Sequence, residues 1–253
     1  MRAHATAFLG MLSSLLPSAG HAQSCPEILD DALRLLLVTT PAMNSSRARL
    51  KVFERASREL PWTSVGTAEP AVVGRAGLAW GHGFDGTAQG DEPRKVEGDG
   101  RTPAGMFRIG ASFGFGRSEL PGHIAIRPGK TVCVDDASSP LYNTITTLTR
   151  IGTRTSREDM WRIPLYKRGL LVDYPTDREH RRGSCIFIHI WRGPESATAG
   201  CIGLPETRVA ALQEFSRTGA VLAVLPQEAL DRFEGCVPGA DRDAGKKRGE
   251  PDR

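Results

Sequence analysis

A histidine and a cysteine twelve positions apart are the residues of this chain whose types and spacing best suit covalent chemistry. His189 lies in the segment 185–191 (CIFIHIW), and Cys201 ends the run Thr198-Ala199-Gly200-Cys201. A thiolate attacks a carbonyl carbon, and a neighbouring imidazole can take the proton from the thiol. The pair therefore predicts a nucleophile, Cys201, with His189 as its general base and acid.

The elements around this pair must hold both side chains toward one point. Three isoleucines alternate along the predicted strand and share one face: Ile186, Ile188 and Ile190. His189 then shares the opposite face with Cys185 and Phe187, because successive strand side chains alternate. A loop containing Gly and Pro leads from this strand to Cys201. Gly200 allows a close backbone approach, and the N–H groups of Gly200 and Cys201 are candidates for binding an oxyanion.

The N-terminus has the three-part pattern of a secretory signal over residues 1–22. Ala7–Leu16 is a mostly apolar run of ten, and Gly20 and Ala22 supply small residues at the −3 and −1 positions. That run is too short to span a bilayer. We therefore expect an exported protein of the periplasm or cell envelope, with no membrane span in the mature chain.

The 253 residues carry a net charge of +4, and basic residues are interleaved with acidic ones. No basic stripe with stacking aromatics is present, so nucleic acid is not an expected partner. The length after residue 22 suits one domain, over 23–238. The last stretch, 239–253 (GADRDAGKKRGEPDR), has too little apolar surface to fold and is predicted to be a disordered charged tail.

Five cysteines leave one unpaired: Cys25, Cys133, Cys185, Cys201 and Cys236. Disulfides persist in exported proteins, and an odd cysteine there is a reactive thiol or pairs with another chain. Cys25 and Cys236 flank the predicted first and last strands, so a bridge between them would tie the two ends of the domain. Cys133 and Cys185 lie on predicted strands and can pair if those strands are neighbours, and the alternative is two buried thiols. This scheme leaves Cys201 free.

The rest of the chain is mostly strand and turn, with one clear helix over Pro205–Arg217. Its apolar stripe is Val209, Leu212 and Phe215, although Leu204 is a poor cap. Ser24 and Glu27 have the form of a capping box for a short helix that ends near Arg34. The predicted strands are Leu35–Thr39, Arg47–Arg55, Pro70–Trp80, Met106–Ile109, His123–Ile126, Thr131–Val134, Gly169–Asp173, Cys185–Trp191 and Ala220–Leu225.

Two motifs resemble those of a known family, the L,D-transpeptidases of the YkuD type. The strand-borne His189 followed by Thr198-x-Gly200-Cys201 resembles their catalytic motif, and 97–107 (EGDGRTPAGMF) resembles their GDGxTPxGxF turn and strand. The resemblance covers roughly 35–225 and implies a mainly β sandwich or open barrel with one or two packed helices. The chain departs from the pattern at Ala199, where many members have His, and at Gly203, where many have Arg or Asn. Its His-to-Cys spacing is also shorter than usual.

The resemblance implies thioester formation at Cys201 with peptidoglycan stem peptides, then transfer to an amine that cross-links the cell wall. Thr198, Trp191 and Arg192 are candidate substrate contacts, with packing and rim solvation as the alternative for the last two. A cysteine hydrolase of the L,D-carboxypeptidase type and an inert peptidoglycan-binding module remain as alternatives. The sequence does not name the acceptor or the oligomeric state.

No cofactor or metal is expected for this chemistry. His180, Cys185, His189 and Cys201 could form a zinc site, but they lack the tight pair spacing of structural zinc. Cys201 as a half-cystine and His189 as a core histidine are the structural alternatives. Glu97 and Asp99 stand among Gly, Arg and Pro and are predicted to form a turn.

Overall fold

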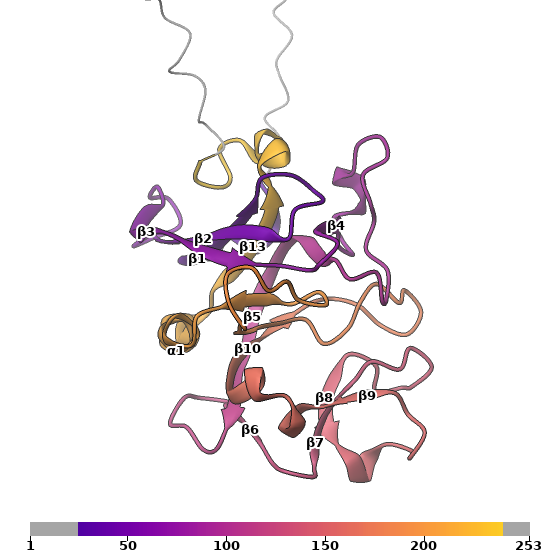
Figure 1. The fold of residues 1–253 in the computed structure, drawn as a ribbon. Helices are drawn as coiled ribbons and strands as arrows, with labels where there is room; N and C mark the ends of the chain where they lie inside the picture. Colours follow the sequence, from indigo (N-terminus) through magenta and orange to yellow (C-terminus); the bar gives the residue numbers. More distant parts are fainter. Residues whose placement is uncertain (1–24, 240–253) are drawn as a thin grey trace, which may run out of the picture.

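The protein is mainly β, as predicted, and a computed structural model describes residues 25–239 (Figure 1). The strands are β1 (Arg34–Thr40), β2 (Arg47–Glu54), β3 (Thr63–Val72), β4 (Leu78–Trp80), β5 (Thr102–Phe115), β6 (Ile124–Ile126), β7 (Thr131–Val134), β8 (Thr144–Thr147), β9 (Arg157–Asp159), β10 (Arg168–Asp173), β11 (Phe187–Ile190), β12 (Ile202–Leu204) and β13 (Val221–Pro226). The α-helix is α1 (Glu206–Phe215). The 3₁₀ segments are η1 (Glu27–Leu29), η2 (Asp85–Thr87), η3 (Leu148–Arg150), η4 (Met160–Arg162), η5 (Pro164–Lys167), η6 (Ser216–Thr218) and η7 (Gln227–Phe233).

Eight strands close into a mixed barrel. Their order is β10-β11-β12-β3-β2-β1-β13-β5, and pairing of β5 with β10 completes the ring. β4 and β6 extend the sheet beside β5. A separate three-stranded sheet, in the order β8-β7-β9, lies at the lower end in Figure 1. The prediction of a mainly β sandwich or open barrel is confirmed as a barrel, and the small sheet is tied to Cys185, just before β11, by the disulfide from Cys133 of β7.

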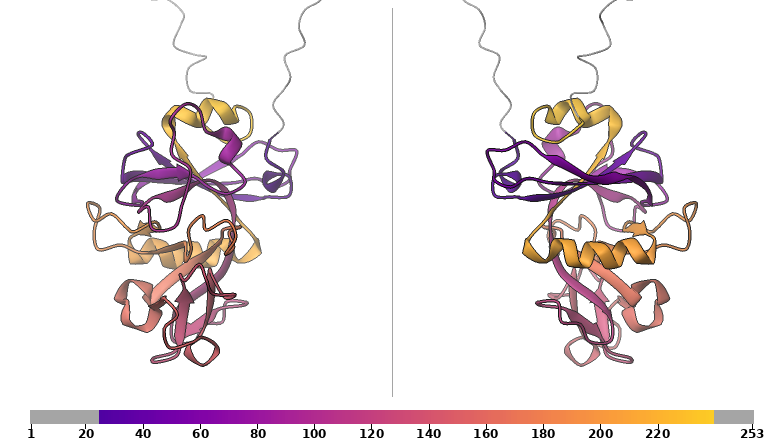
Figure 2. Two further views of the ribbon diagram at one scale, coloured as in Figure 1. Left: turned by 90° about the vertical axis from the view of Figure 1, so that its right-hand side faces the viewer. Right: turned by 90° about the vertical axis from the view of Figure 1, so that its left-hand side faces the viewer.

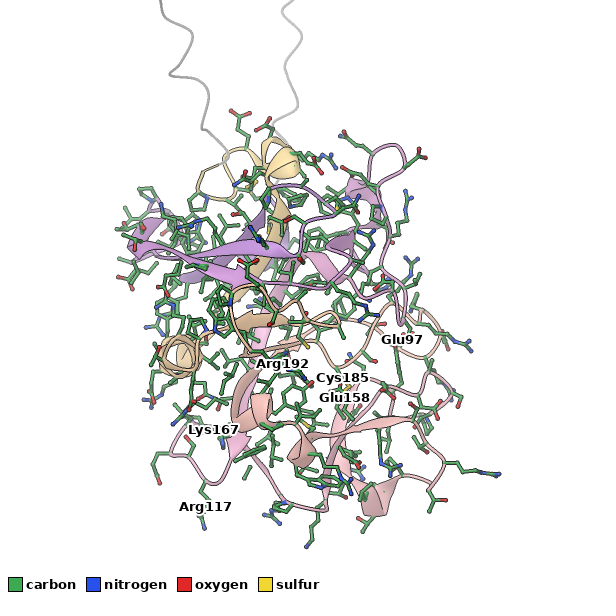
Figure 3. All side chains as sticks on the ribbon, viewed as in Figure 1. Glu97, Arg117, Glu158, Lys167, Cys185 and Arg192 are labelled. Carbon is green, nitrogen blue, oxygen red and sulfur yellow. A yellow bond between two sulfur atoms is a disulfide. The ribbon has the colours of Figure 1, made fainter. Side chains whose placement is uncertain are left out.

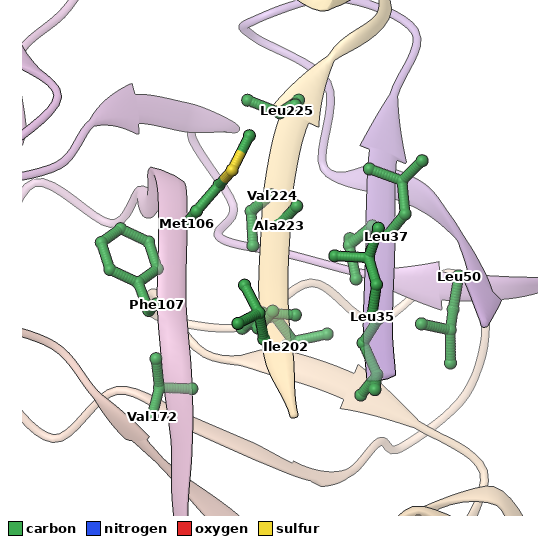
Figure 4. Packing of buried hydrophobic residues seen from close by; sticks show 14 of the residues in the cluster. Leu35, Leu37, Leu50, Met106, Phe107, Val172, Ile202, Ala223, Val224 and Leu225 are labelled. Carbon is green, nitrogen blue, oxygen red and sulfur yellow. The ribbon is translucent and has the colours of Figure 1, made fainter. Parts of the chain in front are cut away.

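The main core lies around two parallel neighbours, β1 and β13. Their register pairs Leu36 with Leu222 and Val38 with Val224, all four of them buried. Figure 4 shows a neighbouring pair, Leu37 and Ala223, on the same two strands. Strands buried on both faces have continuous apolar sequences, which explains LLLV in β1 and VLAVL in β13. Full burial of one such leucine contributes about 1.5–3 kcal/mol.

Helix α1 covers β10 and β11, and Figure 2 shows its full length across the middle of the barrel. Val209 and Leu212 are buried as the stripe predicted, and no side chain caps the helix N-terminus. Gln213 is also buried, and its Nε2 donates to Phe113 O at 3.0 Å and to Gly169 O at 2.9 Å. These two bonds fix the helix to β5 and β10. A second helix, the 3₁₀ segment η7, buries Leu230 and Phe233 in the main core.

Two of the predicted elements have a different structure, while others, such as β5 and β11, differ from their predictions in length. The segment Pro70–Trp80 is not one strand, because β3 ends at Val72 and Gly77 (φ +87°) turns the chain before β4. A side chain at Gly77 would also meet Met43 O at 2.2 Å. The short helix predicted after Ser24 is a single 3₁₀ turn, η1, which follows Pro26 without a side-chain cap. Ser24 itself lies outside the described residues.

The predicted signal peptide, 1–22, and the predicted tail, 239–253 apart from Gly239, also lie outside the described residues. Among residues 25–239, no helix is long and apolar enough to cross a membrane.

Candidate active site

His189 lies in the middle of the sheet, on β11 between β10 and β12. Its register partners are Gly169 and Gly203, and it is 6% exposed. The ring Nδ1 lies 2.7 Å from Ile190 O. A carbonyl only accepts hydrogen bonds, so Nδ1 carries the proton and Nε2 is left with a lone pair. Burial lowers the pKa of His189, so the ring is neutral and Nε2 can accept a proton.

Cys201 directly precedes β12, which runs parallel to β11. Because His189 is in register with Gly203, Cys201 two residues earlier presents its side chain on the same face as His189. The thiol is 8% exposed and donates from Sγ to Cys185 O at 3.3 Å. Burial first, and then the negative charge of Glu158, raise its pKa to about 12. The resting group is therefore a neutral thiol.

The face shared by this pair is aromatic. The Tyr166 ring packs edge-on against His189, with centroids 5.3 Å apart, and against Phe187 at 5.4 Å. A side chain at Gly169 would lie 2.1 Å from the ring of Phe113, so glycine leaves the space that this ring fills. The predicted division of faces is correct, because Ile186 and Ile188 join the main core while Cys185 and Phe187 join this second cluster.

Two threonines hold the turn that presents Cys201. Thr198 Oγ1 donates to Cys201 O at 2.6 Å and accepts from Gly200 N at 3.1 Å. Thr102 Oγ1 donates to the same carbonyl at 3.2 Å. Gly200 has φ +156°, and a side chain there would meet Arg101 O at 3.1 Å, so the turn requires glycine. In this state the hydroxyl of Thr198 is used within the turn, and so is the Gly200 N–H that was predicted to bind an oxyanion.

Cys201 opens onto a cavity of about 190 Å³ between the barrel and the small sheet. The charged residues in its wall are Arg75, Lys95, Glu97, Asp135 and Glu158. Lys95 is 3% exposed and donates to Asp99 Oδ1 at 2.6 Å and to Val96 O at 2.8 Å. Asp99 also accepts from the backbone N–H of Arg101, at 2.9 Å, which agrees with its predicted role in a turn.

Sequence analysis did not identify Glu158 and Tyr166 as members of this site. The Tyr166 hydroxyl donates to Glu158 Oε2 at 2.7 Å, and it also lowers the pKa of Cys201 by a small amount, which favours the thiolate. Burial raises the pKa of Glu158 to about 7, with smaller contributions from Asp135 and Glu97. Both residues lie far from the Cys201 motif in sequence and stand among other charged and aromatic residues, so no local pattern distinguishes them.

Of the remaining predicted residues, Glu97 lines the cavity but Trp191 and Arg192 do not. Glu97 accepts hydrogen bonds from the Tyr142 hydroxyl and, at 2.8 Å, from Ser184 Oγ. The backbone N–H of Trp191 donates to Leu204 O at 2.9 Å, which extends the β11–β12 pairing. Arg192 is exposed.

The structure contains two disulfides, Cys25–Cys236 and Cys133–Cys185, and leaves Cys201 free. These are the pairs predicted from the sequence. The second bridge joins β7 of the small sheet to the residue whose carbonyl accepts from the Cys201 thiol. It also takes the sulfur of Cys185 out of the zinc site considered above.

Cys185 itself adopts φ +54°, which is rare for a residue with a side chain. Its N–H donates to Asn143 Oδ1 at 2.9 Å, and its sulfur is bonded to Cys133. The small sheet therefore fixes one side of the cavity through both a hydrogen bond and a covalent bond.

Comparison with known proteins gives one family. The family model described as YkuD, L,D-transpeptidase catalytic domain, matches residues 44–224. Comparisons with curated proteins and with solved structures gave no match. The two disulfides and this family indicate an extracytoplasmic protein with a peptidoglycan substrate. The matched region spans β2 to β13 and includes both His189 and Cys201, so the chain belongs to the YkuD family of L,D-transpeptidase catalytic domains.

Proposed function

We propose that the protein is an L,D-transpeptidase of the periplasm or cell envelope, which forms a thioester between Cys201 and a peptidoglycan stem peptide and transfers it to an amine. The observation that carries this proposal is the placement of the free thiol. Cys201 lies at the wall of a cavity, on the same face as a neutral histidine of the adjacent strand.

The resting thiol and imidazole are both neutral, so the attack is coupled to proton transfer. His189 Nε2 takes the thiol proton as the C–S bond forms. The Phe187 N–H and the nearby Tyr166 hydroxyl both lower the pKa of the thiol, and so they favour the thiolate as it develops. The N–H groups of Cys201 and Gly200 stabilise the oxyanion, after Gly200 has exchanged its bond to Thr198.

Collapse of the tetrahedral intermediate breaks the C–N bond and releases the terminal D-amino acid, whose nitrogen needs a proton. An acceptor amine then attacks the thioester, and the sulfur recovers its proton from His189. We propose a stem tetrapeptide as the donor and a 3→3 cross-link as the product. Family membership supports both assignments.

The test is turnover of a muropeptide with a tetrapeptide stem, followed by mass spectrometry of the protein and the products. We expect a thioester adduct on Cys201 and a cross-linked dimer. Cys201→Ser and His189→Ala each abolish the adduct while the protein stays folded, since the two groups act as one unit. His180→Ala, at an exposed histidine, is the matched control and retains turnover.

Other outcomes identify the alternatives. A shortened tripeptide stem without dimer indicates a carboxypeptidase, in which water resolves the thioester. Binding of the muropeptide without any adduct indicates an inert module and contradicts the proposal.

A further inference from the structure

Glu158 is the carboxyl group in the cavity wall that contacts the aromatic neighbour of the catalytic pair. It lies on β9 of the small sheet, where its register partner is Cys133. Figure 3 shows it beside Cys185, and it lines the same cavity as Cys201. The hydrogen bond from Tyr166 at 2.7 Å fixes the carboxyl group. Glu158 therefore faces the space in which a substrate bound to Cys201 would lie.

His189 is placed differently. Its ring is 6% exposed, is covered by Tyr166, and does not belong to the described cavity wall. The β11–β12 register puts it on the same face of the sheet as Cys201, whereas the cavity that Cys201 and Glu158 line is the space open to a substrate. The structure therefore assigns different positions to the two groups: His189 shares a sheet face with Cys201, and Glu158 lies in the wall of the cavity where the substrate nitrogen would be.

We propose that Glu158 is a second catalytic residue, which donates a proton to the leaving nitrogen and takes one from the acceptor amine. This inference rests on the proposed function. In this scheme His189 exchanges a proton only with the sulfur of Cys201. The substrate class that follows is a donor with an amide leaving group and an acceptor with a primary amine.

The protons balance over one cycle. In acylation, the thiol proton passes to His189 Nε2, the C–S bond forms, the C–N bond breaks, and the leaving nitrogen takes the proton of Glu158. In deacylation, the acceptor nitrogen attacks the thioester and loses a proton to the Glu158 carboxylate. The C–S bond breaks, and the sulfur takes its proton back from His189. Both residues return to their starting states without an external reactant.

The surroundings of Glu158 suit both roles. Burial raises its pKa to about 7, and Asp135 and Glu97 oppose its ionisation further. The Tyr166 hydroxyl opposes this shift by donating to it. The cavity also contains Arg75 and Lys95, and Lys95 is already paired with Asp99. Near neutral pH both protonation states are populated, which general acid–base catalysis requires.

The test compares two donors that differ only in the leaving group. One is the stem tetrapeptide, whose amide nitrogen needs a proton to leave. The other is a p-nitrophenyl ester of the same acyl peptide, whose phenolate leaves without one. In Glu158→Gln, we expect kcat/KM for the amide to fall by roughly 100-fold or more, the range for general acid–base groups. Acylation by the ester should stay within about 3-fold of wild type.

The pH profile provides a second measure that a structural role would not affect. In the wild type, the amide rate should fall as pH rises through about 7. This fall should be absent with the ester and absent in Glu158→Gln. Asp135→Asn is the matched control. It removes a neighbouring negative charge, so it should move the fall to lower pH without changing the ratio of amide to ester rates on the plateau below the fall.

Equal losses with both donors would show that Glu158 only supports the fold of the site, and would overturn the inference. An unchanged amide rate would also overturn it, while acylation of the wild type would leave the proposed function intact. If neither donor acylates wild-type Cys201, the proposed function fails and this inference fails with it.

Discussion

Glu158 should make the stability of the protein depend on pH in a direction opposite to that of most carboxylates. Its pKa rises from 4.5 to about 7 on folding, so the native state holds a proton that the unfolded chain releases. This contribution is fully present below pH 4.5 and is lost as pH rises through about 7. Raising a pKa from 4.5 to about 7 corresponds to a contribution of about 3 kcal/mol, on the order of 1.36 kcal/mol for each tenfold change in proton affinity.

Glu158→Gln tests this magnitude, because glutamine keeps an acceptor for Tyr166 but does not titrate. The free energy of unfolding in urea is measured between pH 4 and pH 8, without reductant, for the wild type and the variant. Relative to wild type, the variant should gain up to about 3 kcal/mol of stability across that interval. Glu119→Gln removes an exposed carboxylate and is the matched control. If the free energy of unfolding changed with pH in the same way for Glu158→Gln and wild type, the raised pKa of Glu158 would be refuted.

Four further predictions concern the thiol, its turn and the disulfide that ties the chain ends. Because the pKa of Cys201 rises from 9.0 to about 12, its alkylation by iodoacetamide at neutral pH should be about 10³-fold slower than in the unfolded chain. That rate should rise about tenfold per pH unit, and a fast neutral rate would contradict the burial of the thiol. Thr198→Val should lower kcat by roughly fivefold, since one hydrogen bond contributes about 1 kcal/mol, and an unchanged rate would show that the turn holds without it. Replacing both Cys25 and Cys236 by serine should cost about 5 kcal/mol in urea unfolding for a sequence separation of 211, and an unchanged midpoint would contradict it. A carbapenem should add its own mass to Cys201 and not to Cys201→Ser, because its strained carbonyl meets the same thiol.

Strand patterns in the sequence predicted individual strands where burial alone decides the structure, and the family resemblance implied the barrel. The apolar runs of β1 and β13 and the segment Thr131–Val134 form strands at or close to their predicted limits. β5 was predicted only over Met106–Ile109, because its glycines hide a strand that extends from Thr102 to Phe115. β12 has only three residues, and it is a strand because it pairs with β11. No local sequence pattern predicts that pairing.

The candidate site was predictable only as far as its motif extends along the chain. The motif placed His189 and Cys201 on adjacent segments, and the odd number of cysteines indicated the free thiol. Glu158 and Tyr166 reach the site through the small sheet and the turn after it, and only the fold brings them together. The same fold uses the Thr198 hydroxyl to hold the turn, whereas the sequence suggested a contact with substrate.

The most direct test of the central claim is the intact mass of the protein after a short incubation with the stem tetrapeptide donor. The account predicts an increase equal to the donor minus its terminal D-amino acid, mapped to Cys201 and released by hydroxylamine. The increase should be absent in Cys201→Ser and His189→Ala. An adduct on another residue, or full turnover by Cys201→Ser, would contradict the assignment of Cys201 as the nucleophile.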